Sequence, residues 1–308
     1  MITAQRHLFS DEAIVAKNKD LPLPSVALAR VDRVDFENPM HIGQLALLES
    51  EVTCAGTKSI EVQVKVFAED IQTGHKKQTN KARLWYVVVD DFCAQPGWHG
   101  HGKQEMPPKL PVSKFEVPRL KFVSAQDEKD AAVRYAAQKQ SRNPTQSRLE
   151  ATSSIRRPGA LPVLSHVAHP NDCYRSGSVY GGVVMKLMDT AAGVTAVKYC
   201  KTNCVTASVE ALNMVAPVFL GNLIRVFAHP TFTSSRTLEV AVYVEAEDLF
   251  TGHSWHAVSA HLTFVSLDSN GKVLPVPPLV PKSHEARVDY KLGEERYRLR
   301  KLERSKGA

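Results

Sequence analysis

The segment Gly181–Cys200 has the sequence GGVVMKLMDTAAGVTAVKYC, which opens with two glycines and is apolar on most of its faces. It is longer than an ordinary strand, which favours a helix. A helix with so little polar surface has to be covered by other elements before it is stable in water. The segment therefore predicts a buried helix with a sheet wrapped around it.

An internal repeat provides that sheet twice. Residues 29–90 align without a gap onto residues 207–268, at a constant offset of 178. The identical pairs include Pro39 and Pro217, Gly43 and Gly221, and Glu61 and Glu239. Within each copy, apolar and polar residues alternate with a period of two, which is typical of strands. The chain is a duplication, and each copy predicts an antiparallel sheet.

The organisation of the whole chain follows from the repeat. A proline-rich stretch and a charged helical stretch come after each copy, at residues 106–141 and 274–305. We expect four segments: a first repeat at 1–115, a linker with a surface helix at 116–160, a second repeat at 161–282, and a charged helix at 283–308. The composition, 43% hydrophobic and 23% charged, is sufficient for two cores.

The same composition argues against several classes of protein. The longest apolar stretch, 181–197, is interrupted by Lys186 and Asp189, so no membrane span is expected. The net charge of +7 is concentrated in a tail of alternating sign, which favours a solvated helix over nucleic-acid binding. Five cysteines without a CxxC pair predict reduced thiols in the cytoplasm, and His99 and His101 lack a third metal ligand nearby.

Several motifs resemble those of the tandem hotdog cytosolic acyl-CoA thioesterases, the brain-type acyl-CoA hydrolase family. They are GGVVMKLMD at 181–189, KTNCVTASV at 201–209, LPVPPLVP at 274–281, VDRVDFENPMHIG at 31–43 and TNKARLWYV at 79–87. The resemblance implies an α+β fold with two hotdog repeats, each an antiparallel sheet around a central helix. It also implies hydrolysis of long-chain fatty acyl-CoA without a cofactor, and a homo-oligomer in which three tandem chains bring together six hotdogs.

The first repeat departs from the family pattern. At the offset of 178 the counterpart of Gly181 is Thr3, so the glycine pair and the preceding asparagine loop of the family have no counterpart. We expect this repeat to lack most of its helix, with a remnant at residues 10–16 that places Asp11 opposite Asp189. This departure predicts weak or absent activity. The alternative function is a catalytically impaired hotdog module that binds acyl-CoA or acts as an oligomer partner.

The resemblance assigns the chemistry to Asp189, which matches the family's helix carboxylate and is expected to act as general base or nucleophile. The helix start at Gly181 and Gly182 is expected to polarise the thioester carbonyl, because its N–H groups lie at the positive end of the helix dipole. The alternatives without a catalytic role are a hydrogen-bonded core carboxylate for Asp189 and a tight turn for the two glycines. A dehydratase is disfavoured because His169 lies well upstream of the helix.

A second set of residues is expected to bind the substrate. Hydroxyls and a guanidinium between two predicted strands are suited to the pantetheine or phosphate end of CoA, although a solvated turn explains the same residues. Tyr180 stands where the family usually has a histidine. The expected substrate-binding residues are Tyr180, Gly181, Thr206, Ser208, Thr233, Ser234, Ser235 and Arg236.

Overall fold

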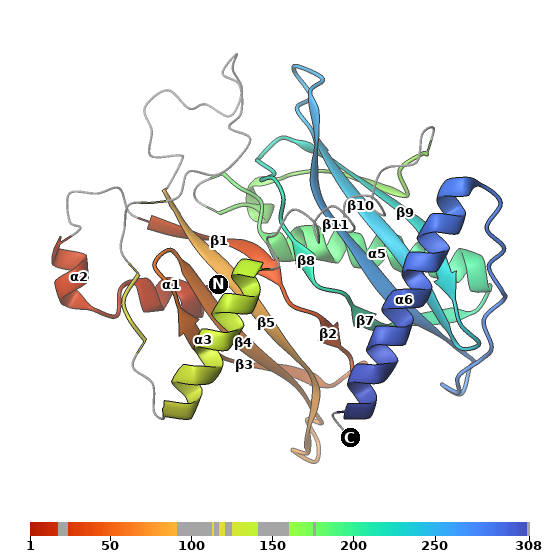
Figure 1. Cartoon of the computed structure of the whole chain (residues 1–308), viewed down its shortest axis with the longest axis horizontal. Helices are drawn as coiled ribbons and strands as arrows, with labels where there is room; N and C mark the ends of the chain where they lie inside the picture. Colours follow the sequence, from red (N-terminus) through yellow and green to blue (C-terminus); the bar gives the residue numbers. More distant parts are fainter. Residues whose placement is uncertain are drawn as a thin grey trace.

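The computed structural model shows two sheets with helices on both of their faces (Figure 1). The residues that it describes are 1–17, 24–90, 113, 117–120, 125–140, 160–174 and 177–306. His99 and His101 lie outside them.

The second half wraps a six-stranded antiparallel sheet around α5 (Gly181–Cys200). The strand order is β2-β7-β11-β10-β9-β6. The elements of this half are β6 (Leu164–Val167), the 3-10 helix η2 (Pro170–Asp172), α5, β7 (Asn203–Val209), β8 (Leu212–Asn213), β9 (Leu223–Thr233), β10 (Thr237–Glu247), β11 (Ser254–Leu267) and α6 (His284–Lys306). Helix α5 packs on β9, β10 and β7, and α6 contacts β9.

The first half has a five-stranded sheet in the order β3-β4-β5-β1-β8. Its elements are α1 (Ile2–Leu8), α2 (Glu12–Lys17), β1 (Pro24–Val31), β2 (Val34–Asp35), β3 (Leu45–Ala55), β4 (Ser59–Glu69), β5 (Lys76–Asp90) and α3 (Ala125–Gln140). Short β2 and β8 each pair with the other half: Val34 with Val209, and Arg30 with Asn213. The two sheets are therefore joined along one seam.

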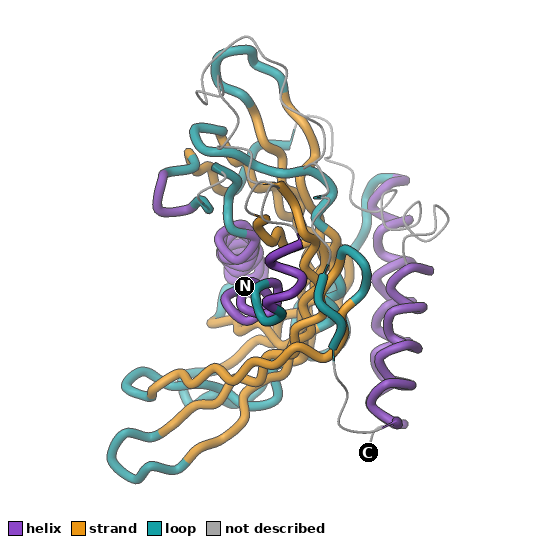
Figure 2. The backbone as a smooth tube through the Cα atoms, turned by 90° about the vertical axis from the view of Figure 1, so that its left-hand side faces the viewer, coloured by secondary structure: helices purple, strands orange, loops and turns teal. Residues whose placement is uncertain are grey.

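This architecture confirms the predicted α+β fold with two hotdog repeats. Figure 2 shows helices on both sides of the sheets, with the chain's N-terminus on one side and its C-terminus on the other. Helices α1 and α5 lie on what we call the inner face, whereas α3 and α6 lie on the outer face. Bulges shift the register within several strand pairs, among them β7 with β11.

The predicted remnant at residues 10–16 overlaps α2 (Glu12–Lys17), whose Val15 packs against the first core, but its assignment as the counterpart of the helix around Asp189 was wrong. The helix that covers the first core is α1, at residues 2–8, and its Ala4 and Leu8 are fully buried in a cluster with Ile60 and Val62. Its sequence ITA at 2–4 matches VTA at 194–196, the last turns of α5, at an offset of 192. The first repeat has 14 more residues between helix and strand, so Thr3 corresponds to Thr195 and Asp11 does not correspond to Asp189.

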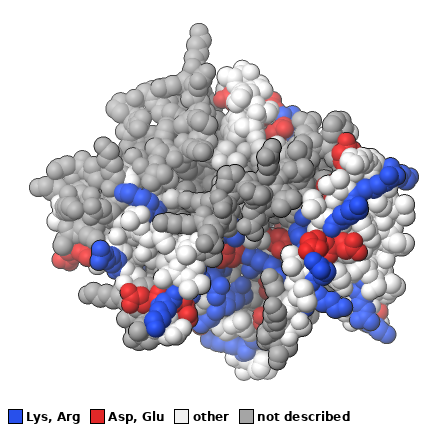
Figure 3. All heavy atoms as spheres, in the orientation of Figure 1, with Lys and Arg blue, Asp and Glu red and all other residues white. Residues whose placement is uncertain are grey.

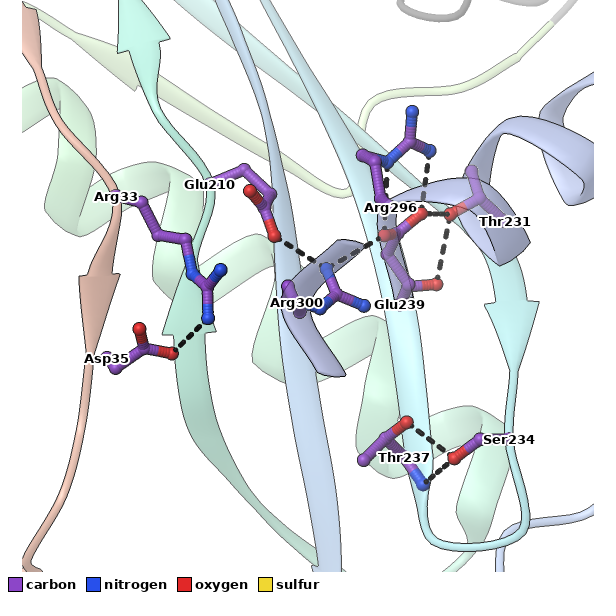
Figure 4. A network of polar contacts seen from close by, with 9 residues as sticks. All are labelled: Arg33, Asp35, Glu210, Thr231, Ser234, Thr237, Glu239, Arg296 and Arg300. Atoms are coloured by element: carbon purple, nitrogen blue, oxygen red, sulfur yellow. Dashed lines mark hydrogen bonds and ion pairs between the residues drawn. The ribbon is translucent and has the colours of Figure 1, made fainter. Parts of the chain in front are cut away.

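The outer helices are held by one buried glutamate in each repeat. Glu61 accepts a hydrogen bond from Arg134 of α3, and its counterpart Glu239 is bound by Arg296 and Arg300 of α6 (Figure 4). Burial alone would raise the pKa of Glu239, but the electrostatic interaction with His261, the hydrogen bond from Arg296 and the charges of Arg296 and Arg300 lower it to about 2. The carboxylate therefore remains charged, which keeps the guanidinium groups of α6 on the sheet.

Candidate active site

Asp189 lies on the solvent-facing side of α5. The opposite side of the helix, with Val184, Met188 and Ala192, is buried against the sheet. The carboxylate is exposed and accepts a hydrogen bond from the hydroxyl of Thr206 on β7, at 2.7 Å between Oγ1 and Oδ1. The expectation of a helix buried on most faces was wrong here, because α5 is covered by the sheet on one side only. Asp189 is consequently not a core carboxylate.

The two glycines at the start of α5 have different roles. A Cβ atom on Gly181 would lie 2.6 Å from Leu28 Cδ2 and 3.2 Å from Met214 Cε, so the glycine permits β1 of the first half to pack against the helix start. A Cβ atom on Gly182 would meet no atom within 4 Å. Packing explains Gly181. Only Gly182 leaves open space where a ligand can approach the helix N-terminus.

Gly182 and Asp189 are separated along the helix. Seven residues at a rise of 1.5 Å place them roughly 10 Å apart along the axis, about two turns. A thioester carbonyl bound at the N–H of Gly182 is therefore out of hydrogen-bonding reach of Asp189. The two groups mark two separate points on one helix face.

Two tyrosines and an apolar cavity lie beside the helix start. Tyr180 is the N-cap residue of α5, and its ring lies 4.1 Å from that of Tyr174 between centroids. Burial raises the pKa of the Tyr174 hydroxyl, which remains protonated. A cavity of about 50 Å³ next to Gly181 is lined by both halves, including Leu28 from β1 and Met214. Nothing in the sequence singled out Leu28 or Met214, because each belongs to an ordinary apolar stretch.

The β7 bulge places two predicted residues on opposite faces of the sheet. Thr206 pairs with Phe264, which packs in the inner core, whereas Ser208 pairs with Thr263 on the outer face. Ala207 is the extra residue between them. Thr206 therefore contacts Asp189, while Ser208 is buried near α6. A strict alternation of side chains would have placed both on the same face.

The predicted hydroxyl and guanidinium group forms the β9–β10 hairpin. Ser234 and Thr237 bond to each other through their hydroxyls, and Thr233 accepts the N–H of Leu279. The carbonyl of Ser235 accepts the N–H of Val276. These groups attach the hairpin to the proline-rich segment, and no contact joins them to Asp189 within the described residues. Arg236 is exposed.

The described residues contain neither a candidate metal centre nor a candidate membrane span. No cluster of three or more His, Cys, Asp or Glu side chains among them is arranged to hold a metal ion. None of the described helices combines the length and the apolar character needed to span a membrane.

The comparisons with known proteins agree with the fold. The thioesterase superfamily model matches residues 2–75 and 176–250. The cytosolic acyl coenzyme A thioester hydrolase of Rattus norvegicus is 39% identical over 287 residues, which are 90% of this chain and 71% of that protein. The chain belongs to the acyl-CoA thioester hydrolase family. The match of the superfamily model to residues 2–75 includes α1, which agrees with the assignment of this helix to the first hotdog.

More distant relatives match less than half of this chain. The uncharacterized acyl-CoA thioester hydrolase YkhA of Bacillus subtilis is 34% identical over 116 residues, which are 38% of this chain and 67% of that protein. A solved acyl-CoA hydrolase from Staphylococcus aureus is 27% identical and covers 47% of this chain and 88% of its own, with a TM-score of 0.44.

Proposed function

We propose that this protein hydrolyses fatty acyl-CoA in the cytosol, giving a free fatty acid and CoA. Membership of the family and the name of the 39% identical rat protein, an acyl coenzyme A thioester hydrolase, support the reaction class. The observation that carries the proposal is the exposed carboxylate of Asp189, which is oriented by the Thr206 hydroxyl and is the one acidic side chain of α5. A carboxylate held in this way has a second oxygen that remains available for chemistry.

In the proposed reaction Asp189 acts as general base. It removes a proton from a water molecule while the water oxygen attacks the thioester carbonyl carbon, and the C–S bond then breaks. The proton passes to the departing sulfur, so that CoA leaves as a thiol. The alternative is direct attack by the carboxylate, which forms an anhydride that water then hydrolyses. In both routes Thr206 is a positioning residue.

The separation between Asp189 and Gly182 has a consequence for the assembly. A thioester that reacts at Asp189 also needs a hydrogen-bond donor to polarise its carbonyl. A thioester bound at the N–H of Gly182 also needs a carboxylate. We propose that these partners come from another hotdog repeat, in a homo-oligomer in which three tandem chains associate. The exposed inner face of the first sheet favours such association.

The acyl chain is proposed to enter the apolar cavity beside Gly181, with the CoA end directed toward solvent and Arg236 available to its phosphates. Leu28 and Met214 are among the residues that line this cavity of about 50 Å³. Both side chains have rotatable bonds, so the cavity is proposed to open for a long chain. Rates for acyl-CoA substrates from four to eighteen carbons will test the long-chain preference.

The reaction is tested with a matched pair of carboxylate variants. Asp189→Asn should lower turnover about a hundredfold or more, on the scale of a lost general base, with little change in the affinity for a non-hydrolysable acyl-CoA analogue. Asp11→Asn, which neutralises an exposed carboxylate in the first half, should leave turnover unchanged. Wild-type turnover in folded Asp189→Asn protein would remove this residue from the mechanism. Binding of acyl-CoA without hydrolysis by the wild type would instead favour a binding module.

A further inference from the structure

A cavity without a role in the proposed reaction lies behind the sheet, between α6 and strands β7, β10 and β11. Its volume is about 190 Å³, which is room for several water-sized groups. The polar side chains that line it are those of Ser208, Thr237, Thr263, Tyr297, Arg300 and Lys301. All of them carry hydrogen-bond donors, and no carboxylate is among the described lining residues.

Two donors in the cavity wall lack partners. Thr263 and Arg300 are 5% and 6% exposed, and neither the Thr263 hydroxyl nor Arg300 Nη2 has a hydrogen-bond partner within the described residues. An unpaired buried donor is unfavourable, because it has lost its hydrogen bonds to water without gaining another. A bound acceptor would remove that cost. The two donors therefore point to a ligand that accepts hydrogen bonds.

The charge around the cavity favours an anion. Arg300 Nη1 is already paired with Glu210 at 2.6 Å and with Glu239 at 3.3 Å, and Arg296 also binds Glu239 (Figure 4). Those two carboxylates balance the two arginines, and Lys301 is the remaining charged side chain among the described residues that line the cavity. Lysine and arginine side chains also line α6 on the surrounding surface, mixed with acidic ones (Figure 3).

We propose that this cavity binds a small phosphate-bearing anion. A phosphate group has several acceptor oxygens, which match a guanidinium, an ammonium and converging hydroxyls. The inner site that contains Asp189 is on the other face of the sheet, so an occupant here does not compete with the thioester. The ligand is either free phosphate or the phosphoryl group of a larger molecule such as a nucleotide.

The cavity is connected to Asp189 through three consecutive residues. Ser208 and the bulge residue Ala207 line it, and the next residue, Thr206, donates its hydroxyl to Asp189. The carbonyl of Ala207 accepts the N–H of Phe36 from the first half. An anion bound at Ser208 is therefore expected to shift the bulge at Ala207, which orients Thr206 toward Asp189. Binding of the anion should consequently change turnover. This second part of the proposal rests on the proposed function, whereas anion binding does not.

Binding is measured first, without any hydrolysis. The full chain is titrated with inorganic phosphate and, separately, with adenosine 3′,5′-bisphosphate, by calorimetry and by ³¹P NMR. Lys301→Gln and Thr263→Val should each weaken phosphate binding about fivefold, since each removes roughly 1 kcal/mol of interaction. Lys291→Gln removes the same charge from an exposed position on α6 outside the cavity lining and should bind as the wild type does.

The results separate the two parts of the proposal. No phosphate binding by the wild type, or an equal loss in Lys291→Gln and Lys301→Gln, overturns the anion site. Tighter binding of the bisphosphate identifies a nucleotide as the source of the phosphate. In an active enzyme, saturating phosphate should change kcat at least twofold for the wild type and leave kcat of Lys301→Gln unchanged at the same concentration. An equal effect on both overturns the coupling, and a protein without hydrolysis leaves the binding result valid.

Discussion

The inner faces of the two sheets carry similar strand sequences in very different surroundings. In the second half, the 20 residues of α5 cover the sheet, and Val226 is 0% exposed. In the first half, the seven residues of α1 cover one end only, so Ile60 is fully buried while Leu48, the counterpart of Val226, is 68% exposed. The alternation of residues along the strands determines which face of each sheet is apolar. Whether that apolar face becomes buried in a core depends on the helix that covers it.

The loops that follow the short strands β2 and β8 show the same difference between the two halves. Val218 in the second half is 5% exposed, because Val179 donates its N–H to the Val218 carbonyl and the segment packs on the loop. Its counterpart Met40 is 41% exposed. One segment, which includes α5 and the residues before it, therefore accounts for both contrasts.

The largest effect is expected when the first sheet receives the same cover. We expect a copy of residues 160–193, fused directly ahead of Ile2, to continue into α1 as a full helix. Burial of Leu48 and its neighbours should raise the free energy of unfolding by about 1.5–3 kcal/mol per fully buried side chain. It should also raise turnover at least tenfold and reduce the binding of a hydrophobic dye. The control is a Gly/Ser linker of the same length at the same place. Equal dye binding and turnover in the two fusions would contradict the comparison.

The two glutamate anchors should differ in their tolerance to the loss of an arginine. Among the described residues, Arg134→Ala leaves Glu61 with the Thr53 hydroxyl as its side-chain hydrogen-bond partner, and it should lower the free energy of unfolding by about 3–5 kcal/mol. Arg296→Ala should have a smaller effect, because Glu239 retains Arg300 and Thr231. Urea unfolding measures both. The control is Arg298→Ala, which removes an exposed pair with Glu295 and should change little.

The contact between the halves is tested at the glycine pair. Gly181→Ala should destabilise the protein by up to about 3 kcal/mol, because its Cβ overlaps Leu28. Gly182→Ala should leave the thermal midpoint unchanged, and any loss should appear in turnover. If the overlap is the cause, Leu28→Ala should recover part of the stability lost by Gly181→Ala. Additive losses in the double variant would show that the glycine is needed for another reason.

The smallest effect concerns pH. Burial, followed by the charge of Arg296, lowers the pKa of His261 to about 4, whereas its counterpart in the first half is Arg83, which does not titrate in this range. The unfolded chain binds the proton first, near pH 6.5, so stability falls as the pH decreases from 6.5 towards 4. Between pH 7 and pH 5 the wild type should lose about 2 kcal/mol more than His261→Gln. Parallel pH profiles of the thermal midpoint would exclude His261 as the cause.

Much of the fold could be predicted from the sequence, because duplication and period-two alternation are local patterns. The offset of 178 identified which strands of the two repeats correspond to each other, and the apolar run after Gly181 predicted the position of α5. The same offset misplaced the first helix, since the connection between helix and strand differs in length and an ungapped alignment does not detect this. The position of α1 became visible only through the burial of Ala4 and Leu8.

For the candidate site, the sequence by itself determined that Asp189 and the glycine pair lie on one helix. The tertiary structure decided which groups meet. A β-bulge turned Thr206 toward Asp189 and Ser208 away from it, and a strand from the other half gave Gly181 a packing role. Register shifts and contacts across the seam depend on residues far apart in the chain, so no local pattern contains them. The exposure of Asp189 was decided in the same way, by which side of α5 the sheet covers.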